Sequence, residues 1–587
     1  MEKRAKTLNE ALVRAAPRVD CGVRIVDRRE RATWLSWSEI FDRASRVAGG
    51  LRAAGVETGD MVGLLYPTGE EFFAAIFGTL LCGAVPVPLY PPVRLGRLPE
   101  YLDRTAHMLR AAEVRLVLTD VRLRRILGTA LAKAGCQDRS LTQLPRAEPI
   151  AREVPADALA LVQFSSGTTL DPKPVALTHR AVLAQTGILN DFWPDRPGLR
   201  HTGVSWLPLY HDMGLIGCVF PVLERPSVLT VIPPEAFVAR PAIWLRMLSK
   251  YRATISPAPN FAYGLCVEKI RDAELEGVDL SEWRIALNGA EAVVPSVVRA
   301  FNQRFSKWGL RPEALTPVYG LSEAALAVTF STIDEPTTNR RFARQSLGSD
   351  SKVVVSASGR ELVSVGRPVP GFEVEVRGRA GRVLGEGRVG RIWAKGPSLM
   401  KEYLHQRETT QRTLVEGWLD TGDLGFFSAG ELYITGREKD VLIVRGSNHA
   451  PEEIEAVVSE LADARTGCCA AVSHLPEGAE REQVWLFVER RRGADAAAGN
   501  GLVDACRRRV LAQTSIAVDR VEVLAPGTLP RTSSGKIRRQ ETLRRYLDSR
   551  LDPPKPVSAT RLLLTMGRSV IAQWRQPGTV GDLRDAG

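Results

Sequence analysis

The chain has 587 residues, a formal net charge of +12 and 44% apolar residues. These values exclude a small disulfide-stabilised protein, a disordered polyelectrolyte and a collagen-like fibre, and the length predicts several domains. Charge alone would permit nucleic acid or an anionic membrane as a partner. However, the sequence has no zinc-finger spacing, no aromatic RNA-binding signature and no long basic run, so we expect no nucleic-acid partner.

The longest apolar stretch, residues 72–89, contains two glycines and two prolines. It predicts a buried helix that ends near Gly83 and is followed by a short strand, rather than a transmembrane segment. Residues 1–20 are charged and lack the apolar region of a signal peptide. The eight cysteines form no C-x-x-C pair and no metal-type cluster, which favours a reducing, cytoplasmic location.

Strand-like apolar runs alternate with helical stretches through the first part of the chain. These runs lie at residues 62–67, 114–120, 158–164, 228–233 and 284–290. The alternation predicts an α/β fold in which parallel sheets are joined by crossover helices. From Gly366 onward, short strands separated by glycines predict a β-rich antiparallel subdomain.

A boundary is predicted near Gly436. We expect an N-terminal domain at 1–435, which includes an insertion at 331–365, and a small, mobile α+β lid domain at 436–550. The lid would contain a helix from Pro451, strands at 467–473 and 484–490, a second helix and a final strand. Residues 551–587 would form a linker and tail, with a basic amphipathic helix at 560–575 that packs on its own protein.

Residues 163–175, QFSSGTTLDPKPV, follow a predicted strand and concentrate groups that bind phosphate. The hydroxyls, the backbone N–H groups and the nearby ammonium suit the oxygens of a polyphosphate. The relevant residues are Ser165, Ser166, Gly167, Thr168, Thr169 and Lys173. The segment has the spacing of neither a Walker A loop nor a nucleophile elbow, and an ordinary polar turn is the alternative interpretation.

Four later segments add acidic, histidine and aromatic candidates: LPLYHDMGL (207–215), NGAE (288–291), YGLSEA (319–324) and GWLDTGDLG (417–425). Glu323 follows a turn and is a suitable Mg²⁺ ligand. Asp423 can accept hydrogen bonds from ribose hydroxyls, and Tyr319 offers an aromatic face to adenine. Taken singly, each has a plain structural explanation: loop carboxylates, a core tyrosine, and a helix-start pair at His211 and Asp212.

Five motifs occur in a characteristic order: SSGTT-x-x-PK, YGLSE, GWLDTGD, GREKD and PRTSSGK. This order resembles the adenylate-forming superfamily of acyl-CoA synthetases, nonribosomal adenylation domains and firefly luciferase, from about Thr7 to Leu547. Within it the chain is most similar to fatty acyl-AMP ligases. That similarity rests on residues 85–105, residues 206–217, NGAE and the long interval between Glu323 and Gly366.

The resemblance implies that a fatty carboxylate attacks the α-phosphorus of ATP to give acyl-adenylate and pyrophosphate. Thr168 and its neighbours would cradle the β- and γ-phosphates, Glu323 would hold Mg²⁺, and Asp423 with Arg437 would hold the ribose. The implied nucleotide-binding residues are Ser165, Ser166, Gly167, Thr168, Thr169, Lys173, Gly289, Ala290, Glu291, Tyr319, Gly320, Ser322, Asp423 and Arg437. Leu170 and Pro174 replace glycines usual in the phosphate loop and predict a stiffer or differently shaped loop.

The resemblance also assigns two lysines. Lys536 would bridge the carboxylate and the α-phosphate, and Lys439 would be the hinge about which the C-terminal domain rotates. A solvated surface lysine is the alternative at each position. Residues 235–265 would line part of the pocket for the acyl chain. The alternative is that this apolar stretch simply belongs to the hydrophobic core. The implied substrate-lining motif residues are His211, Asp212, Met213 and Gly214.

The expected acceptor is the phosphopantetheine thiol of an acyl carrier protein, or of a polyketide or nonribosomal synthase module, acting in trans. Carriers are typically acidic, so we expect a complementary basic face. It would consist of Arg531, Lys536, Arg538, Arg539, Arg544 and Arg545. Two other hypotheses stay open: an acyl-CoA synthetase that uses free coenzyme A, and a catalytically silent protein that binds nucleotide or acyl-adenylate.

Overall fold

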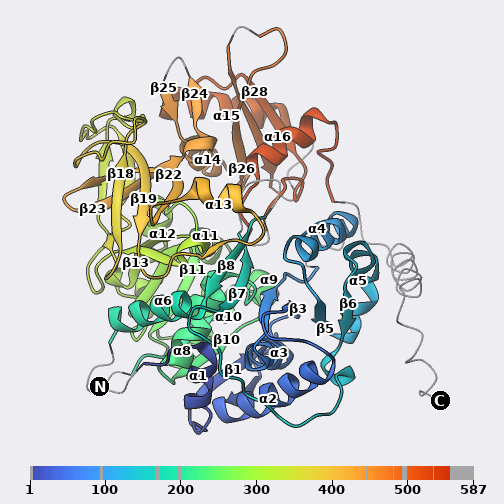
Figure 1. The fold of residues 1–587 in the computed structure, drawn as a ribbon. Helices are drawn as coiled ribbons and strands as arrows, with labels where there is room; N and C mark the ends of the chain where they lie inside the picture. Colours follow the sequence, from blue (N-terminus) through green and yellow to red (C-terminus); the bar gives the residue numbers. More distant parts are fainter. Residues whose placement is uncertain are drawn as a thin grey trace.

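The computed structural model describes most of the chain. The described residues are 4–92, 97–165, 172–194, 200–444, 447–479, 481–491, 493, 499–532 and 535–554. Figure 1 shows the C-terminal elements, in orange and red, stacked on a larger N-terminal part that contains two α/β layers and a β-rich lobe. Ser166–Thr169, Leu170 and the 560–575 segment lie outside the described residues.

The largest sheet has nine strands in the order β17-β14-β13-β12-β11-β9-β10-β1-β2. Its six central strands, β13 to β1 in that order, are parallel. Strands β2 and β14 are antiparallel to the central strands beside them, and β17 is antiparallel to β14. The bounds are β1 Gly22–Val26, β2 Ala32–Ser36, β9 Gly203–Ser205, β10 Val228–Val231, β11 Ile255–Pro259, β12 Ile285–Gly289, β13 Leu315–Gly320, β14 Ala327–Phe330 and β17 Arg367–Pro368. The predicted α/β class is confirmed.

A second, fully parallel sheet has the order β4-β3-β5-β6. Its strands are β3 Met61–Leu65, β4 Val85–Pro88, β5 Leu116–Thr119 and β6 Gln137–Arg139. Helix α3 (Glu70–Cys82) is buried along nearly its whole length and ends at Gly83, whose positive φ of 85° suits a residue without a Cβ. The helix and strand expected in residues 72–89 are therefore confirmed.

The strand at 158–164 differs from its prediction. It is β7 (Leu159–Phe164), and it pairs antiparallel with β8 (Pro174–Thr178) in a small sheet of order β20-β8-β7. Strand β20 (Glu402–Tyr403) completes this sheet from a distant part of the sequence. An apolar run predicts a buried strand but not its direction. Here the antiparallel pairing with β8, the next strand in the sequence, sets the direction of β7.

The β-rich lobe is an antiparallel sheet of order β18-β19-β22-β21, with β23 paired to β22. The bounds are β18 Glu373–Arg377, β19 Gly390–Lys395, β21 Leu414–Val415, β22 Trp418–Ser428 and β23 Glu431–Arg437. The 331–365 segment is not structureless, because it contains a hairpin of β15 (Asn339–Phe342) and β16 (Arg360–Val363). Phe342 from this hairpin packs against Phe426 and Tyr433 of the lobe.

Helices cover the sheets of the N-terminal part. They are α1 Leu8–Ala15, α2 Trp37–Ala53, α4 Leu98–Ala111, α5 Val121–Ala134, α6 His179–Phe192, α7 Asp212–Gly214, α8 Phe220–Glu224, α9 Pro234–Ala239, α10 Ala242–Lys250, α11 Asn260–Lys269, α12 Pro295–Phe305 and α13 Arg407–Thr413. Helix α2 begins with a capping box in which Ser36 and Glu39 satisfy each other's backbone N–H groups. A π-helical turn, Leu215–Val219, joins α7 to α8.

The C-terminal elements have hydrophobic clusters of their own. They are β24 Leu442–Val444, β25 Ser447–His449, α14 Pro451–Ser459, β26 Ala464–His474, β27 Gln483–Arg490, α15 Gly499–Thr514, β28 Arg520–Leu524 and α16 Arg539–Leu547. Strands β26, β27 and β28 form one sheet, against which α14, α15 and α16 pack. Among the helices that the structure describes, none combines the length and apolar composition needed to cross a bilayer.

Candidate active site

The predicted nucleotide-binding residues gather at the carboxyl ends of neighbouring parallel strands. NGAE closes β12 and YGLSEA closes β13, and such edges are where open α/β sheets bind ligands. Ala290 and Ala325 both have positive φ, 66° and 63°, a backbone conformation that non-glycine residues rarely adopt. Backbone strain of this kind is concentrated at functional sites. Here it occurs within NGAE, at Ala290, and directly after YGLSEA, at Ala325.

Asp423 is held by two side chains. The Tyr319 hydroxyl donates to its Oδ2 atom at 2.7 Å, and the Arg437 Nε donates to its Oδ1 atom at 3.0 Å. Asp423 on β22 lies directly opposite Arg437 at the end of β23, so the β-rich lobe supplies both groups. The Asp423 carboxylate holds the pKa of Arg437 above its usual range. Each carboxylate oxygen keeps a lone pair that a ribose hydroxyl could use.

Glu323 is held by Tyr403, a residue outside the five sequence motifs. The Tyr403 hydroxyl donates to Glu323 Oε1 at 2.7 Å, and the Met400 N–H donates to the Glu323 carbonyl at 2.7 Å. The Lys173 ammonium lies 4.5 Å from the centre of the Tyr403 ring. Tyr403 lies in the two-residue strand β20, which pairs with β8. It is far in sequence from Glu323 and Lys173, and no sequence motif around it predicts a contact with either of them.

Asp212 is buried at the start of α7, and each of its carboxylate oxygens contacts one polar side chain. His211 Nδ1 lies 2.5 Å from Asp212 Oδ1, and the Ser322 hydroxyl donates to Asp212 Oδ2 at 2.5 Å. Burial opposes ionisation, but the His211 and Ser322 contacts outweigh it and lower the pKa of Asp212. The contact with Ser322 joins the HDMG segment to YGLSEA.

Glycines in these motifs are explained by close packing. A Cβ on Gly320 would lie 1.7 Å from the Leu326 carbonyl oxygen, and one on Gly214 would lie 2.2 Å from the Pro208 carbonyl oxygen. Gly289 is similarly crowded by Val318, at 2.6 Å. These three predicted site residues therefore let the backbone segments of the site approach each other.

Glu291 and Lys536 come together from distant parts of the chain. Glu291 Oε1 accepts a hydrogen bond from the Phe261 N–H at 2.6 Å, and burial raises the pKa of this carboxyl. Lys536 lies in a turn whose backbone is hydrogen-bonded to Thr532. Burial and Arg437 lower the pKa of Lys536, and the charges of Asp212, Glu291 and Asp423 oppose that shift. The structure thus brings Lys536 to the same site as the N-terminal carboxylates.

The phosphate segment is described only at its two ends. The Ser165 N–H donates to the Lys173 carbonyl at 2.9 Å, and the Lys173 N–H donates to the Ser165 hydroxyl at 3.3 Å. These bonds close the base of a loop whose middle, Ser166–Thr169 with Leu170, lies outside the described residues. Pro174 is the first residue of β8, where its missing N–H interrupts no helix.

Lys439 occupies a one-turn 3₁₀ helix, Glu438–Asp440, between β23 and β24. Burial and the Arg437 guanidinium lower the pKa of Lys439. Next to it, buried Asp440 pairs with Arg539 at 3.2 Å, and Arg539 also contacts Glu452 and Glu455. The assignment of Lys439 as a hinge stays a prediction.

The expected basic face is not an open surface. Arg538 is 3% exposed, and Arg539 lies inside the carboxylate cluster just described. Arg545 is paired with Glu541 and with Glu100 of α4. Arg531 donates to the carbonyls of Gly535 and Gly467, and Arg544 is paired with Glu541 and Asp548. The prediction that these six residues form a docking face is wrong, because most of their charge is buried or neutralised.

The 235–265 region packs largely as core. Trp206 stacks on Phe237 with ring centroids 3.9 Å apart, and Trp244 lies edge-on to both. Phe237, Trp244 and Tyr263 are fully buried. The aromatic residues expected along an acyl channel are therefore in contact with one another, as in an ordinary hydrophobic core.

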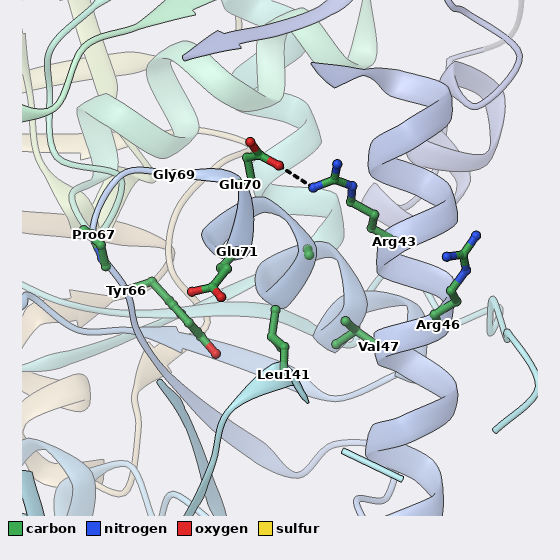
Figure 2. Close-up of a pocket in the computed structure, with 10 residues that line it drawn as sticks. Arg43, Arg46, Val47, Tyr66, Pro67, Gly69, Glu70, Glu71 and Leu141 are labelled. Atoms are coloured by element: carbon green, nitrogen blue, oxygen red, sulfur yellow. Dashed lines mark hydrogen bonds and ion pairs between the residues drawn. The ribbon is translucent and has the colours of Figure 1, made fainter. Parts of the chain in front are cut away.

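A cavity of about 620 Å³ lies at the amino end of α3, next to Tyr66 and Glu71. Figure 2 shows Arg43 of α2 reaching across to Glu70, an ion pair of 2.5 Å. The cavity is also lined by Arg46, Val47, Pro67, Gly69, Ala74 and Leu141. None of the predicted site residues lines it, so this cavity is separate from the candidate active site.

Residues 13–404 match the family of AMP-binding enzymes, and the chain belongs to this family. It is 34% identical to the medium-chain-fatty-acid–[acyl-carrier-protein] ligase JamA of Moorena producens, over 88% of this chain and 90% of that protein. It is also 34% identical to the long-chain-fatty-acid–AMP ligase FadD26 of Mycobacterium marinum, over 88% of this chain and 92% of that protein.

A solved structure from a study of fatty acyl-adenylate ligases of E. coli and L. pneumophila has the same fold. The TM-score is 0.87 at 31% identity, and the match covers 93% of this chain and 98% of that one. Within the AMP-binding enzymes, the chain is thus of the fatty acyl-AMP ligase type, and it is an ATP-using ligase.

Proposed function

We propose that this protein joins a medium- or long-chain fatty acid to the AMP part of ATP, releases pyrophosphate, and then passes the acyl group to a carrier thiol. The observation that supports the proposal is the position of the Lys536 turn: a Cβ on Gly535 would lie 3.9 Å from the ring of Phe261, whose N–H donates to Glu291. The charges of Asp212, Glu291 and Asp423 act on the Lys536 ammonium. A cation from the C-terminal part would thus complete a site built by the N-terminal sheet, at the motifs that resemble those of acyl-adenylate-forming enzymes.

The ATP subsites follow from the positions of the motif residues. Asp423 and Arg437 would hold the ribose hydroxyls, and the bonds from Tyr319 and Arg437 fix the Asp423 carboxylate before the ligand arrives. Thr168 and its neighbours would bind the β- and γ-phosphates, with Lys173 close by. The adenine would lie among Gly289, Ala290, Glu291 and Tyr319, and Gly320 and Ser322 would also belong to the nucleotide site.

Glu323 would hold the Mg²⁺ that accompanies ATP. Mg²⁺ in nucleotide sites is bound by one or two carboxylates together with substrate phosphates, rather than by a full protein cage. Glu323 fits this chemistry, because it is an oxygen ligand whose carboxylate is held in place by the Tyr403 hydroxyl at 2.7 Å. When bound, the ion would neutralise phosphate charge as the two anions approach.

Lys536 would act on the reacting atoms themselves. A fatty carboxylate and an α-phosphate repel each other, and an ammonium placed between their oxygens reduces that repulsion and stabilises the charge that moves during transfer. His211, Asp212, Met213 and Gly214 would line the place of the carboxylate. Asp212 is the electrostatic counterpart of Lys536 from this segment.

The acceptor would be the phosphopantetheine thiol of a carrier protein or synthase module in trans. The name of the JamA relative, an acyl-carrier-protein ligase, supports this choice. Free coenzyme A is the alternative. Because the C-terminal arginines are paired within the protein, the carrier would dock on other residues than those. The cytoplasm is the proposed location, which agrees with eight free, buried cysteines.

The test is to incubate the protein with Mg²⁺, ATP and fatty acids of graded length, and to measure acyl-adenylate and pyrophosphate by mass spectrometry and a coupled assay. We expect both products in equal amounts with some acids. Adding coenzyme A or a phosphopantetheinylated carrier then identifies the acceptor, and we expect acyl-carrier to form. Acyl-CoA formed instead would show the alternative acceptor, and no acyl-adenylate with any acid would contradict the proposal.

A further inference from the structure

Tyr403 occupies an unusual position between two parts of the site. Its hydroxyl donates to Glu323 Oε1 at 2.7 Å, and its ring lies under the Lys173 ammonium at 4.5 Å from the centroid. One side chain therefore contacts both the carboxylate assigned to Mg²⁺ and the lysine at the base of the phosphate loop.

The backbone around Tyr403 connects the same two regions. Met400 donates to the Glu323 carbonyl, and Ser398 donates through its hydroxyl to the Ala324 carbonyl at 2.9 Å. In the other direction, Lys401 donates to the Ala176 carbonyl at 2.9 Å and Leu404 to the Pro174 carbonyl at 2.8 Å. The segment is therefore hydrogen-bonded on one side to the 3₁₀ turn Ser322–Ala324, which follows β13, and on the other side to β8.

The Tyr403 hydroxyl can act only as a donor toward Glu323. Tyr403 is 2% exposed, and a tyrosine hydroxyl, whose ordinary pKa is about 10, keeps its proton at neutral pH. Glu323 Oε1 accepts the hydrogen bond from this hydroxyl. The other carboxylate oxygen, Oε2, is thereby held in a fixed direction, in which it can bind a metal ion. Partners of this kind orient metal ligands, and removing them commonly weakens metal binding 10- to 100-fold.

We propose that Tyr403 is a positioning residue that fixes the Glu323 carboxylate for the Mg²⁺ of Mg·ATP and, through its ring, holds Lys173 beside the phosphates. The inference rests on the proposed function, since it concerns the same nucleotide site. It adds a residue outside the five sequence motifs, and it assigns the hydroxyl and the ring of that residue separate tasks.

The decisive variant is Tyr403→Phe, which deletes the hydroxyl and keeps the ring under Lys173. The matched control is Tyr433→Phe, because Tyr433 is also fully buried but its hydroxyl has no hydrogen-bond partner among the described residues. Nucleotide binding is measured by calorimetry with a non-hydrolysable ATP analogue, with and without Mg²⁺. The Mg²⁺ concentration for half-maximal pyrophosphate exchange is measured alongside.

In Tyr403→Phe we expect Mg²⁺-dependent nucleotide binding to weaken roughly tenfold or more, binding without Mg²⁺ to stay within about twofold, and Tyr433→Phe to behave as wild type. Glu323→Gln should show the same loss, and the double variant Tyr403→Phe/Glu323→Gln should add little to it, because the two residues act as one unit. Additive losses, or an unchanged Mg²⁺ dependence in Tyr403→Phe, would overturn the inference. Failure of the wild-type protein to exchange pyrophosphate would instead contradict the proposed function.

Discussion

Asp423 illustrates how this site is organised at the scale of single residues. Its two oxygens each accept one hydrogen bond, from Tyr319 and from Arg437, and the residue is 6% exposed. The side chain is thus oriented by protein contacts alone. A ribose would meet a preformed acceptor and would not have to order it on binding.

Asp423→Asn is expected to raise the KM for ATP roughly tenfold to a hundredfold, because a hydrogen bond to a charged group contributes about 1.5–3 kcal/mol. The measurement is pyrophosphate exchange as a function of ATP concentration. Asp420→Asn is the control: Asp420 lies on the same strand, but its partner is Arg391 at 2.7 Å. A KM for ATP that is the same in Asp423→Asn and in wild type would refute the ribose assignment.

The sequence predicted many of these residues because they lie in short motifs. Asp423 follows a glycine in GWLDTGD, and Lys536 follows one in SSGK. Tyr403 could not be predicted in this way, since its contacts with Glu323 and Lys173 exist only through the folding of β20 onto β8. The motif glycines were found, but the backbone crowding that requires them is visible only in space.

At the scale of elements, α1 and α6 are joined by a buried histidine. The Leu8 N–H at the start of α1 donates to Nδ1 of His179, the first residue of α6, at 3.1 Å. His179 is 2% exposed, and burial lowers its pKa to about 4. The fold therefore requires the neutral imidazole, with Nδ1 unprotonated.

The pH dependence follows from this shift. His179 in the unfolded chain takes up a proton near its ordinary pKa of about 6.5, whereas the folded chain resists protonation down to about pH 4. His179 thus lowers the free energy of unfolding by roughly 3 kcal/mol as the pH falls through this window. The free energy of unfolding is measured with denaturant at about pH 6.5 and at about pH 4. Its decrease between these two pH values should be smaller in His179→Asn, which keeps an acceptor atom, than in wild type. His405→Asn, a change at an exposed histidine, should behave as wild type; an equal loss in all three proteins would disprove the assignment.

Element types were predicted better than element partners. The helix at Glu70–Cys82 and the strand after it follow from an apolar run and a terminating glycine. The direction of β7 and the hairpin of β15 with β16 did not follow, because pairing depends on residues far along the chain. Local periodicity contains no information about which strand will lie alongside another.

At the scale of the whole molecule, contacts between distant segments place the C-terminal elements over the site. Arg97, just before α4, donates to the Thr528 carbonyl at 2.8 Å, and Arg545 of α16 pairs with Glu100 at 2.9 Å. Arg344 of the 331–365 segment contacts Glu453 of α14. No local motif predicts such contacts. The pair with Glu100 removes Arg545 from a free basic face, whereas Arg539 and Arg544 are paired with carboxylates of the C-terminal part itself.

The central claim is that Lys536, delivered by this arrangement, completes a fatty-acid-adenylating site. The most direct test compares wild type with Lys536→Ala in fatty-acid-dependent ATP–pyrophosphate exchange, with thermal unfolding recorded for both. We expect robust exchange by wild type and a loss of roughly a hundredfold or more in Lys536→Ala, because an electrostatic contact to the reacting groups is removed, with the unfolding temperature nearly unchanged. Equal exchange rates in the two proteins would contradict the account.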